Sequence, residues 1–263
     1  MVMDQNELVD KIVKEVLARL KAHTALEIST QPGAQKSFDI SPQEMARFID
    51  HTLLKPDAVF SQFDQLCDEA KKYNFYSVCV NSSKVAYVAK KLRGSSVKVC
   101  SVIGFPLGEM EKRSKAFEAR TAIDHGAHEL DMVLNIGALK SGNLKLVEED
   151  IRAVKRAMRS TTVLKVILET SLLTESEKIL TCEICKKTEV DFVKTSTGFG
   201  GGGATVEDIQ LMRGVVGPNM GVKASGGIRD FATAVAMIKA GANRIGSASG
   251  VSIITGTRAQ GSY

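Results

Sequence analysis

Five short apolar segments of the 263-residue chain each carry an ionisable residue where a buried strand is expected. Burying a lone charge is costly, so buried charges in proteins are usually paired. A single instance would indicate a structural ion pair or a strand end that reaches solvent. Five instances of complementary sign predict side chains that converge and pair. They are Asp50 in RFIDHTLL, Asp131 in ELDMVLN, Lys165 in TVLKVILE, Lys194 in DFVKTSTGF and Lys223 in GVKASGG.

This set holds three amines and two carboxylates, which leaves an excess of positive charge. Like charges disfavour protonation, so we expect one of the three amines to have a lowered pKa. A neutral lysine amine attacks carbonyl carbons and forms a Schiff base. The set therefore predicts an amine nucleophile, although the charges alone do not say which lysine it is.

Three glycine-rich loops follow apolar segments in the second half of the chain: STGFGGGGAT, ASGGIRD and GSASGV. Glycine lets backbone N–H groups approach and surround an anion, and a following helix presents its positive end. One such loop is more often a turn than a site, but three beside the lysines favour an anion site. We expect a substrate with a phosphate a few bonds from a carbonyl.

Metal and redox chemistry are disfavoured. The four histidines form no HExxH motif, and we expect surface or supporting roles for them. Cys182 and Cys185 form a CxxC motif, but ESEKILTCEICKKTEV has the pattern of an amphipathic helix in which both pack. No cofactor and no metal are predicted, and the five cysteines are expected to be reduced thiols of a cytoplasmic protein.

The elements that position these residues alternate along the chain at intervals of roughly 20 to 30 residues. Val- and Ile-rich strands are expected near 48–53, 76–80, 97–103, 129–134, 163–168, 191–195, 220–224 and 243–246, with amphipathic helices between them. This order predicts an α/β fold, a (β/α)8 TIM barrel. In such barrels active sites lie at the C-terminal mouth, and phosphate sites often use the loops after strands seven and eight.

The first forty residues differ from the barrel segment. Residues 1–21 predict an amphipathic helix, in which Asp4 and Glu7 have the spacing of a capping box. Residues 22–40 read as a linker, and Ser41-Pro42-Gln43-Glu44 marks the start of the barrel domain, residues 41–263. The helix can dock on its own barrel or a sister subunit, belong to a disordered extension, or serve as a targeting signal.

The net charge of +5 is modest, and basic residues alternate with acidic ones. This pattern does not indicate a nucleic-acid-binding protein, although it suits a small anionic substrate. No run approaches 18 apolar residues, so no membrane partner is predicted.

Together the motifs DFVKTSTGF, GVKASGGIR, ELDMVLNIGALKSG, IDHTLLKPDA and VIGFPLG resemble those of deoxyribose-phosphate aldolases, which are class I aldolases. The resemblance covers residues 41–263 nearly throughout. It implies reversible cleavage of 2-deoxy-D-ribose 5-phosphate to acetaldehyde and D-glyceraldehyde 3-phosphate. It also implies that Lys194 forms the Schiff base, that Lys223 keeps that amine nucleophilic, and that Asp131 pairs with Lys223 in proton relay.

Other site residues are implied by the same resemblance. Asp50 is expected to be a supporting or hydroxyl-binding carboxylate, and the C-terminal Tyr263 a proton donor at the enamine carbon. Cys79 and Lys165 lie on strands that face the pocket, and Lys165 is counted among the substrate-binding residues. The remaining phosphate-binding candidates are Gly200, Gly226, Gly227, Arg229, Gly246, Ser247 and Ser249.

Two alternatives stay open. One is another Schiff-base aldolase with a different phosphosugar, and the other is a non-catalytic barrel that acts as a scaffold through its N-terminal helix. That helix and its linker also resemble the encapsulation peptides of bacterial microcompartment enzymes. Residues 4–20 are therefore expected either to bind shell proteins or to dock on the chain's own barrel or a sister subunit. A homodimer or tetramer is the expected assembly.

Overall fold

The computed structural model describes residues 11, 13–18 and 40–257. Tyr263, the Asp4–Glu7 capping box and the linker over 22–39 lie outside the described residues, so the predictions for them stay predictions.

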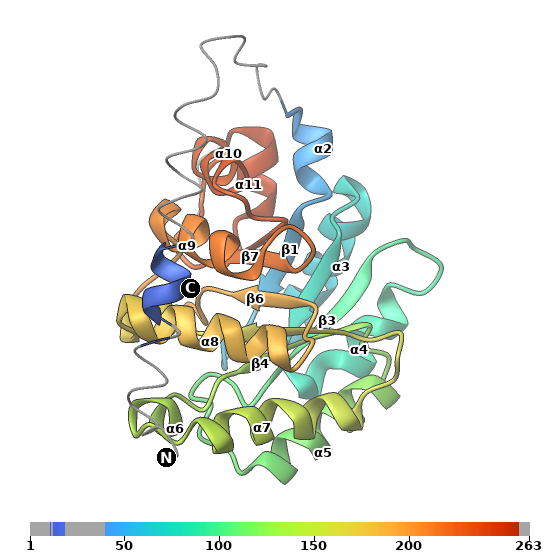
Figure 1. Cartoon of the computed structure of the whole chain (residues 1–263). Coiled ribbons are helices and arrows are strands. Elements are labelled where there is room, and N and C mark those ends of the chain that lie inside the picture. The colour runs from blue at the N-terminus through green and yellow to red at the C-terminus, as the bar shows by residue number, and fades with distance from the viewer. Residues whose placement is uncertain (1–10, 12, 19–39, 258–263) are drawn as a thin grey trace, which may run out of the picture.

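Eight parallel strands form a closed barrel in which each strand pairs with the next and β8 pairs with β1 (Figure 1). This confirms the predicted (β/α)8 TIM barrel, and the predicted strand positions agree to within about two residues at each end. The strands are β1 (Ile49–Leu53), β2 (Ser77–Val80), β3 (Lys98–Ile103), β4 (Glu129–Val133), β5 (Val163–Ile167), β6 (Phe192–Lys194), β7 (Gly221–Ser225) and β8 (Arg244–Ser247).

Helices surround the strands (Figure 1). The first helix of the barrel domain begins as predicted. The side chains of Ser41 and Glu44 each accept a hydrogen bond from the other residue's backbone N–H, which forms a capping box, and Pro42 is the first helical residue. The helices are α2 (Pro42–Ala46), α3 (Phe60–Tyr73), α4 (Val85–Lys91), α5 (Lys112–Asp124), α6 (Ile136–Lys140), α7 (Leu144–Ala157), α8 (Glu175–Lys187), α9 (Val206–Val216), α10 (Phe231–Lys239) and α11 (Gly250–Thr255), with short 3-10 turns η1 (Ser82–Lys84) and η2 (Thr170–Leu172).

The apolar core lies outside the barrel, between the strands and the helices. Strand residues alternate sides, and one set, including Val78, Leu130 and Val193, joins this large cluster. The other set faces the interior, where the apolar cluster is only Leu54, Cys79, Cys100 and Val102, with Phe105 packed against it. Val133 and Ile167 are buried on the same side, and the polar and charged side chains share the interior with these apolar residues.

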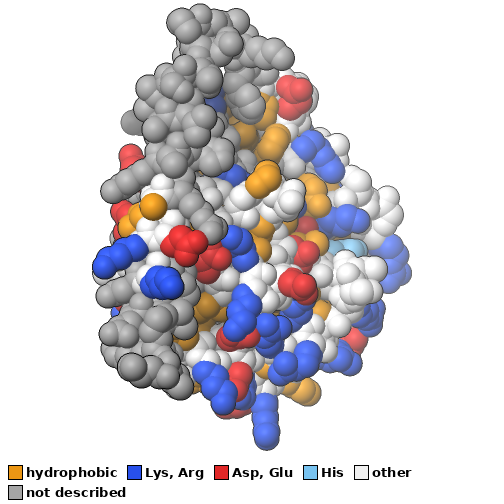
Figure 2. Space-filling view, in the orientation of Figure 1, with side chains coloured by type: hydrophobic (Ala, Val, Ile, Leu, Met, Phe, Trp, Pro, Cys, Tyr) orange, Lys and Arg blue, Asp and Glu red, His pale blue; other side chains and the backbone are white. Residues whose placement is uncertain are grey.

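Cys182 and Cys185 both lie buried on α8 as free thiols, which confirms the packing role predicted for the CxxC motif. On the face seen in Figure 2, basic and acidic side chains lie side by side rather than gathered by sign. No helix within the described ranges is both long and apolar enough to cross a membrane.

The described part of the N-terminal segment is helical, as predicted. Val13 is 6% exposed and belongs to the outer core cluster, and Val16 and Leu17 are partly buried against that cluster. Lys11, Lys14 and Glu15 are exposed. The described apolar residues of this helix, Val13, Val16 and Leu17, therefore face the body of the same chain.

Candidate active site

All five ionisable residues singled out in the sequence point into the barrel, where they meet two more, Glu129 and Arg244. Six of the seven form a closed ring in which every cation binds two carboxylates and every carboxylate binds two ring cations. Around the ring the N–O distances are Asp50–Lys223 2.5 Å, Lys223–Asp131 2.8 Å, Asp131–Lys165 2.8 Å, Lys165–Glu129 2.6 Å, Glu129–Arg244 3.1 Å and Arg244–Asp50 2.8 Å.

Lys194 stands outside the ring, attached to it at one point. Its Nζ lies 2.8 Å from Asp131 Oδ2, the same oxygen that accepts a hydrogen bond from Lys223. Within the described part of the chain, Lys194 has no other carboxylate partner. It is also 3% exposed, whereas Lys165 and Lys223 are fully buried. Of the three lysines, Lys194 is the one that a molecule in the mouth of the barrel can reach.

The ring holds Asp131, Lys165 and Lys223 in their charged forms. Burial by itself would raise the pKa of Asp131, but the ammonium groups of Lys165, Lys194 and Lys223 hold it well below its usual range. Burial would lower the pKa of Lys223, but the carboxylates of Asp131 and Asp50 raise it above its usual range. The pKa of Lys165 is raised in the same way, chiefly by Asp131. Lys223 is therefore an ammonium and Asp131 a carboxylate at neutral pH.

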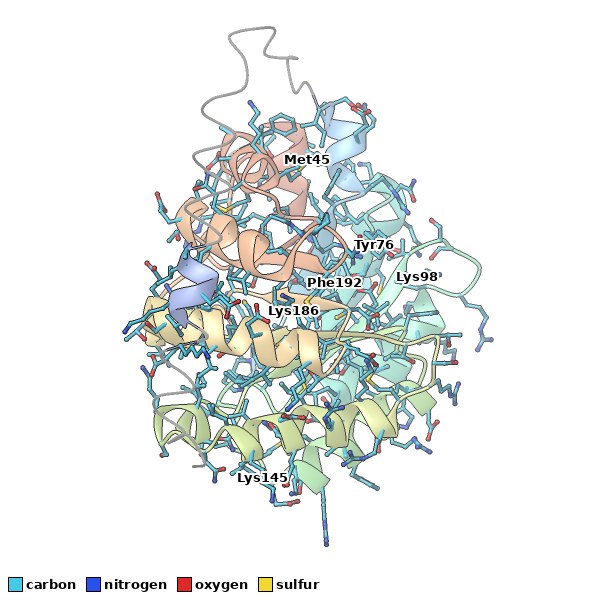
Figure 3. All side chains as sticks on the ribbon, viewed as in Figure 1. Met45, Tyr76, Lys98, Lys145, Lys186 and Phe192 are labelled. Carbon is cyan, nitrogen blue, oxygen red and sulfur yellow. The ribbon has the colours of Figure 1, made fainter. Side chains whose placement is uncertain are left out.

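Aromatic rings close the barrel at the N-terminal ends of the strands, beneath Arg244. The guanidinium carbon of Arg244 lies 3.4 Å from the Tyr76 ring centroid and 5.5 Å from that of Phe192 (Figure 3 labels both aromatic residues). Phe192 fits because residue 221 is glycine: a methyl group there would lie 2.2 Å from the Phe192 ring. The ring of charges is thus shielded from water at this end.

The sequence reasoning missed Glu129 and Arg244. Both are the first residues of their strands, β4 and β8, where a charge is ordinarily taken to reach solvent. Alternation was the signal that could have found Glu129, because it lies two residues before Asp131 and therefore faces the same side of the sheet. Arg244 likewise lies two residues before Gly246 and faces the same side of the sheet.

The structure also corrects the role expected for Lys165. Its Nζ lies between Glu129 and Asp131, and its side chain is fully buried. The amine is occupied by carboxylates and is not open to a substrate phosphate. Cys79 faces the interior as expected, beside Cys100 on the next strand.

The glycines after β6 serve loop packing. A methyl group at Gly200 would lie 2.6 Å from the Glu169 carboxyl carbon, one at Gly202 2.4 Å from Ser171 Cβ, and one at Gly203 2.5 Å from the Gly226 carbonyl oxygen. Ala204 N donates a hydrogen bond to that same carbonyl. Gly200, Gly202 and Gly203 therefore let the β6 loop lie directly on its neighbours, including the β7 loop, whereas Gly201 faces open space and has a positive φ.

The loops after β7 and β8 are joined to each other. Gly226 and Gly227 both have positive φ, which favours glycine. The Ser247 hydroxyl donates to the Ile228 carbonyl and accepts from Ser249 N–H, so it ties the two loops together. Gly246 faces the interior, where a methyl group would lie 3.0 Å from Lys223 Cε. Arg229 is exposed. The structure thus brings the phosphate-binding candidates of these two loops to one end of the barrel. Gly246 differs from them, because it faces the interior and makes room for Lys223.

The comparisons with known proteins agree with this geometry. The model of the DeoC/LacD family aldolases matches residues 45–256. The chain belongs to this family. A Brevibacillus brevis protein named deoxyribose-phosphate aldolase is 62% identical over 83% of this chain and 98% of its own length. A Streptococcus gordonii protein of the same name is 58% identical over 84% of this chain and its whole length.

Solved structures extend the similarity. A protein from Coccidioides immitis aligns over 97% of this chain and 98% of its own, with a TM-score of 0.84 and 39% identity. The tetrameric deoxyribose phosphate aldolase from Aeropyrum pernix aligns over 92% of this chain and 95% of its own, with a TM-score of 0.76 and 33% identity.

One group of potential metal ligands occurs among the described residues of this DeoC/LacD family member: Cys79, Cys100 and Asp131, whose ligand atoms lie within 4.8 Å of one another. Both Asp131 oxygens already accept hydrogen bonds from ammonium groups, and the Cys100 thiol donates to Asp131. The trio lies beside three lysines, which would repel a cation. It fits a metal poorly.

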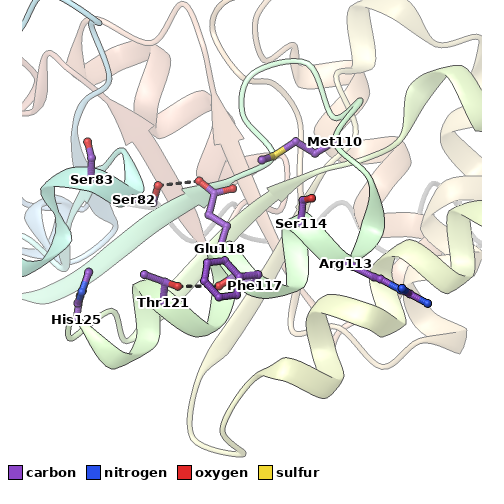
Figure 4. A pocket seen from close by; sticks show the side chains of 9 residues that line it. All are labelled: Ser82, Ser83, Met110, Arg113, Ser114, Phe117, Glu118, Thr121 and His125. Atoms are coloured by element: carbon purple, nitrogen blue, oxygen red, sulfur yellow. Dashed lines mark hydrogen bonds between the residues drawn. The ribbon is translucent and has the colours of Figure 1, made fainter.

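A hollow of about 530 Å³ lies outside the barrel, between η1 and α5 (Figure 4). In it, the Ser82 hydroxyl donates a hydrogen bond to Glu118. None of its lining residues belongs to the charged cluster, so this hollow is separate from the predicted active site of this DeoC/LacD family aldolase. The lining residues are Ser82, Ser83, Met110, Arg113, Ser114, Phe117, Glu118, Thr121 and His125.

Proposed function

We propose that this DeoC/LacD family aldolase reversibly cleaves 2-deoxy-D-ribose 5-phosphate to acetaldehyde and D-glyceraldehyde 3-phosphate through a Schiff base on Lys194. The observation that carries the proposal is the position of Lys194. Its amine lies in the barrel, next to a carboxylate shared with the Lys223 ammonium, and has access to the mouth. The relatives named deoxyribose-phosphate aldolase support the choice of sugar.

The cleavage follows from ordinary imine chemistry. The neutral Lys194 amine attacks the C1 aldehyde of the open-chain sugar, and loss of water gives the imine. Removal of the proton from the C3 hydroxyl breaks the C2–C3 bond. The C2–C3 bonding electrons form the C1–C2 double bond of an enamine while the nitrogen of the protonated imine accepts the C=N electron pair, and glyceraldehyde 3-phosphate leaves. Protonation at C2 and addition of water then release acetaldehyde and the amine.

Asp131 and Lys223 supply the proton transfers in this proposal. Asp131 Oδ2 lies 2.8 Å from both Lys194 Nζ and Lys223 Nζ, so one oxygen connects the reacting amine to a second ammonium. Asp50 holds Lys223 from the other side. Tyr263 is proposed as the proton donor to C2 and has to reach the mouth of the barrel to act.

The substrate phosphate is proposed to bind at the joined loops after β6, β7 and β8. The exposed Arg229 and the backbone N–H groups near Gly200, Gly227 and Ser249 are the donors available there. Gly226 and Ser247 act by shaping these loops, and Gly246 makes room for Lys223, as their close contacts require.

Borohydride trapping in the presence of acetaldehyde tests the reaction. Reduction should fix a two-carbon adduct on the enzyme, and peptide mapping should find it on Lys194. Lys194→Ala should lose both the adduct and the cleavage of deoxyribose 5-phosphate. A Lys194→Ala enzyme that still traps and still cleaves would refute the proposal.

Assembly and location form a second part of the proposal. The chain assembles as a homodimer or homotetramer in the cytoplasm, as the tetrameric structure of the Aeropyrum pernix relative suggests. Light scattering measures the mass directly, and a monomer at micromolar concentration would contradict this. The N-terminal segment is proposed to direct the enzyme into a bacterial microcompartment, which would retain the volatile product acetaldehyde.

The buried Val13 bears on that targeting, because the stripe that would bind a shell protein contacts the chain's own core. Targeting then requires the helix to leave its site. Residues 1–40 fused to a fluorescent protein should give puncta in shell-producing cells, and diffuse fluorescence would rule targeting out. Deleting residues 1–40 from the enzyme should leave cleavage intact.

A further inference from the structure

Three members of the charged ring, Glu129, Lys165 and Arg244, have no direct part in the proposed reaction. Glu129 and Arg244 are the first residues of β4 and β8. They form the side of the ring that lies nearest to the aromatic rings at the N-terminal ends of the strands. Each is nearly or fully buried, at 2%, 0% and 4% exposure. Burying ion pairs in this way seldom adds stability over apolar packing. Their retention here points to a different role.

The charge balance of the cluster indicates that role. The ring contains three cations and three carboxylates, each bound on both sides, so its net charge is zero. Lys194 is a seventh group with a single carboxylate contact. A protonated Lys194 therefore leaves a net charge of +1 in a space shielded from water, and a neutral Lys194 leaves none.

We propose that Glu129, Lys165 and Arg244 are positioning residues that close the ring and thereby make Lys194 the amine that loses its proton. Without them, Asp50 and Asp131 would have fewer cations around them and could retain the Lys194 proton. With them, every carboxylate is satisfied by a ring cation. This inference rests on the proposed function, because it concerns the lysine that must be neutral to attack a carbonyl.

Other titratable groups surround Lys194, and the proposal takes them into account. The thiols of Cys79 and Cys100 come from β2 and β3, and burial raises the pKa of Cys100 well above its usual value. Glu169 follows β5 and is buried, but its contacts are the backbone N–H and hydroxyl of Thr197 rather than a ring member. Of the ring members, Lys165 and Lys223 are thus in ion contact with Asp131, and Asp50, Glu129 and Arg244 are connected to it through these two lysines.

Two substitutions of opposite charge test the proposal through the pH dependence of trapping at Lys194. Glu129→Gln leaves the cluster with excess positive charge, so the pH midpoint for acetaldehyde trapping should fall by about one pH unit. Arg244→Gln leaves excess negative charge, so the midpoint should rise by about one pH unit. The double variant restores the balance and should return the midpoint to that of the unaltered enzyme.

The matched control is Asp150→Asn. Lys115 and Asp150 form a buried ion pair at 2.6 Å between α5 and α7, outside the barrel interior. Breaking it should destabilise the protein as the ring variants do, yet leave the midpoint unchanged. If these residues had only a structural role, neither ring variant would shift the pH midpoint for trapping, or both variants would shift it in the same direction. Either result would overturn the proposal.

Two further measurements make the test independent of folding defects and of the reaction itself. In the unaltered protein with ¹⁵Nζ-labelled lysine, the Lys165 and Lys223 ammonium signals should persist at a pH where Lys194 has lost its proton. A Lys194 ammonium signal that outlasts either of them would overturn the inference. The rate of Lys194 carbamylation by cyanate, which requires a neutral amine, should show the same midpoint shifts. If acetaldehyde trapping fails but these cyanate shifts appear, the proposed function fails and the ring inference stands.

Discussion

At the scale of single residues, Asp131 makes the most consequential contacts in the barrel. Its two oxygens accept hydrogen bonds from Lys165, Lys194 and Lys223, each at 2.8 Å. Asp131→Asn leaves Lys194 without a carboxylate partner among the described residues, and leaves Lys165 and Lys223 with one carboxylate each, Glu129 and Asp50. General acid–base catalysis at such a position contributes about 10²- to 10⁴-fold, so kcat for deoxyribose 5-phosphate cleavage should fall by a factor in that range.

The Asp131→Asn prediction is measured in a coupled assay for glyceraldehyde 3-phosphate, with urea unfolding alongside. The change also leaves buried charges without a full partner, which should cost about 3–5 kcal/mol of unfolding free energy. Asp150→Asn serves as the comparison, because it should lose stability and keep kcat. An Asp131→Asn enzyme that retains a tenth or more of the original kcat would contradict the role assigned to this carboxylate.

Gly246 supports the same site through the absence of a side chain. A methyl group there would lie 3.0 Å from Lys223 Cε and 3.1 Å from Ser225 Cβ. Gly246→Ala should therefore push the Lys223 amine away from Asp131. A displacement of this kind can cost up to about 10²-fold, so we expect kcat to fall about 10- to 100-fold with little change in KM. Steady-state kinetics check this, and a change confined to KM would instead place Gly246 at the phosphate.

At the scale of elements, strand alternation explains how much of the site the sequence could predict. A period of two placed Asp131, Lys165 and Lys194 inside the barrel, and the structure agrees. The same period did not separate Glu129 from an ordinary charge at a strand end, because its burial depends on Arg244 arriving from β8. Contacts between strands that are distant in sequence are not visible in local spacing.

The glycine-rich loop after β6 shows the same limit. Its composition predicted an anion site, but the spacing could not reveal that Gly203 lies against Gly226 of another loop. The helices were easier to predict, since their caps and apolar stripes are local. The Ser41–Glu44 capping box is one such local signal.

The buried pair between α5 and α7 gives an element-scale prediction. Lys115 Nζ lies 2.6 Å from Asp150 and also donates to the Val133 carbonyl, but Asp150 Oδ1 has no hydrogen-bond partner among the residues that the structure describes. Burial raises the pKa of Asp150 despite the nearby lysine, so this carboxylate is poorly compensated. Lys115→Met alone should lower the free energy of unfolding by about 3–5 kcal/mol, because it leaves Asp150 buried without a counter-charge.

The double variant Lys115→Met/Asp150→Leu should recover most of that loss, since apolar pairs often replace buried ion pairs without net cost. Urea unfolding of the two single variants and the double variant measures the coupling between the residues. A double variant less stable than either single variant would show that the pair stabilises the contact between these helices.

At the scale of the whole molecule, the charged ring predicts how stability depends on pH. Asp50 and Asp131 have lowered pKa values, because Arg244 and the lysines outweigh the effect of burial. Their contribution is present above the ordinary Asp pKa of about 3.9 and is lost as the pH falls below it. Lys165 and Lys223 have raised pKa values. Their contribution is present below about pH 10.4 and is lost as the pH rises further.

The contribution of the ring to the free energy of unfolding should therefore be nearly constant from about pH 5 to about pH 10 and fall on both sides. Each pKa difference of one unit changes it by about 1.4 kcal/mol, so the loss should reach several kcal/mol at both extremes. The carboxylates of exposed ion pairs, such as Glu148 beside Lys187, also take up protons in acid. Salt screens these exposed pairs, whereas it screens the buried ring much less. Urea unfolding across this pH range at low and high salt separates the two sources. Lys165→Met should flatten the alkaline fall, and an alkaline limb that is unchanged in this variant would mean that the ring does not set the upper limit of stability.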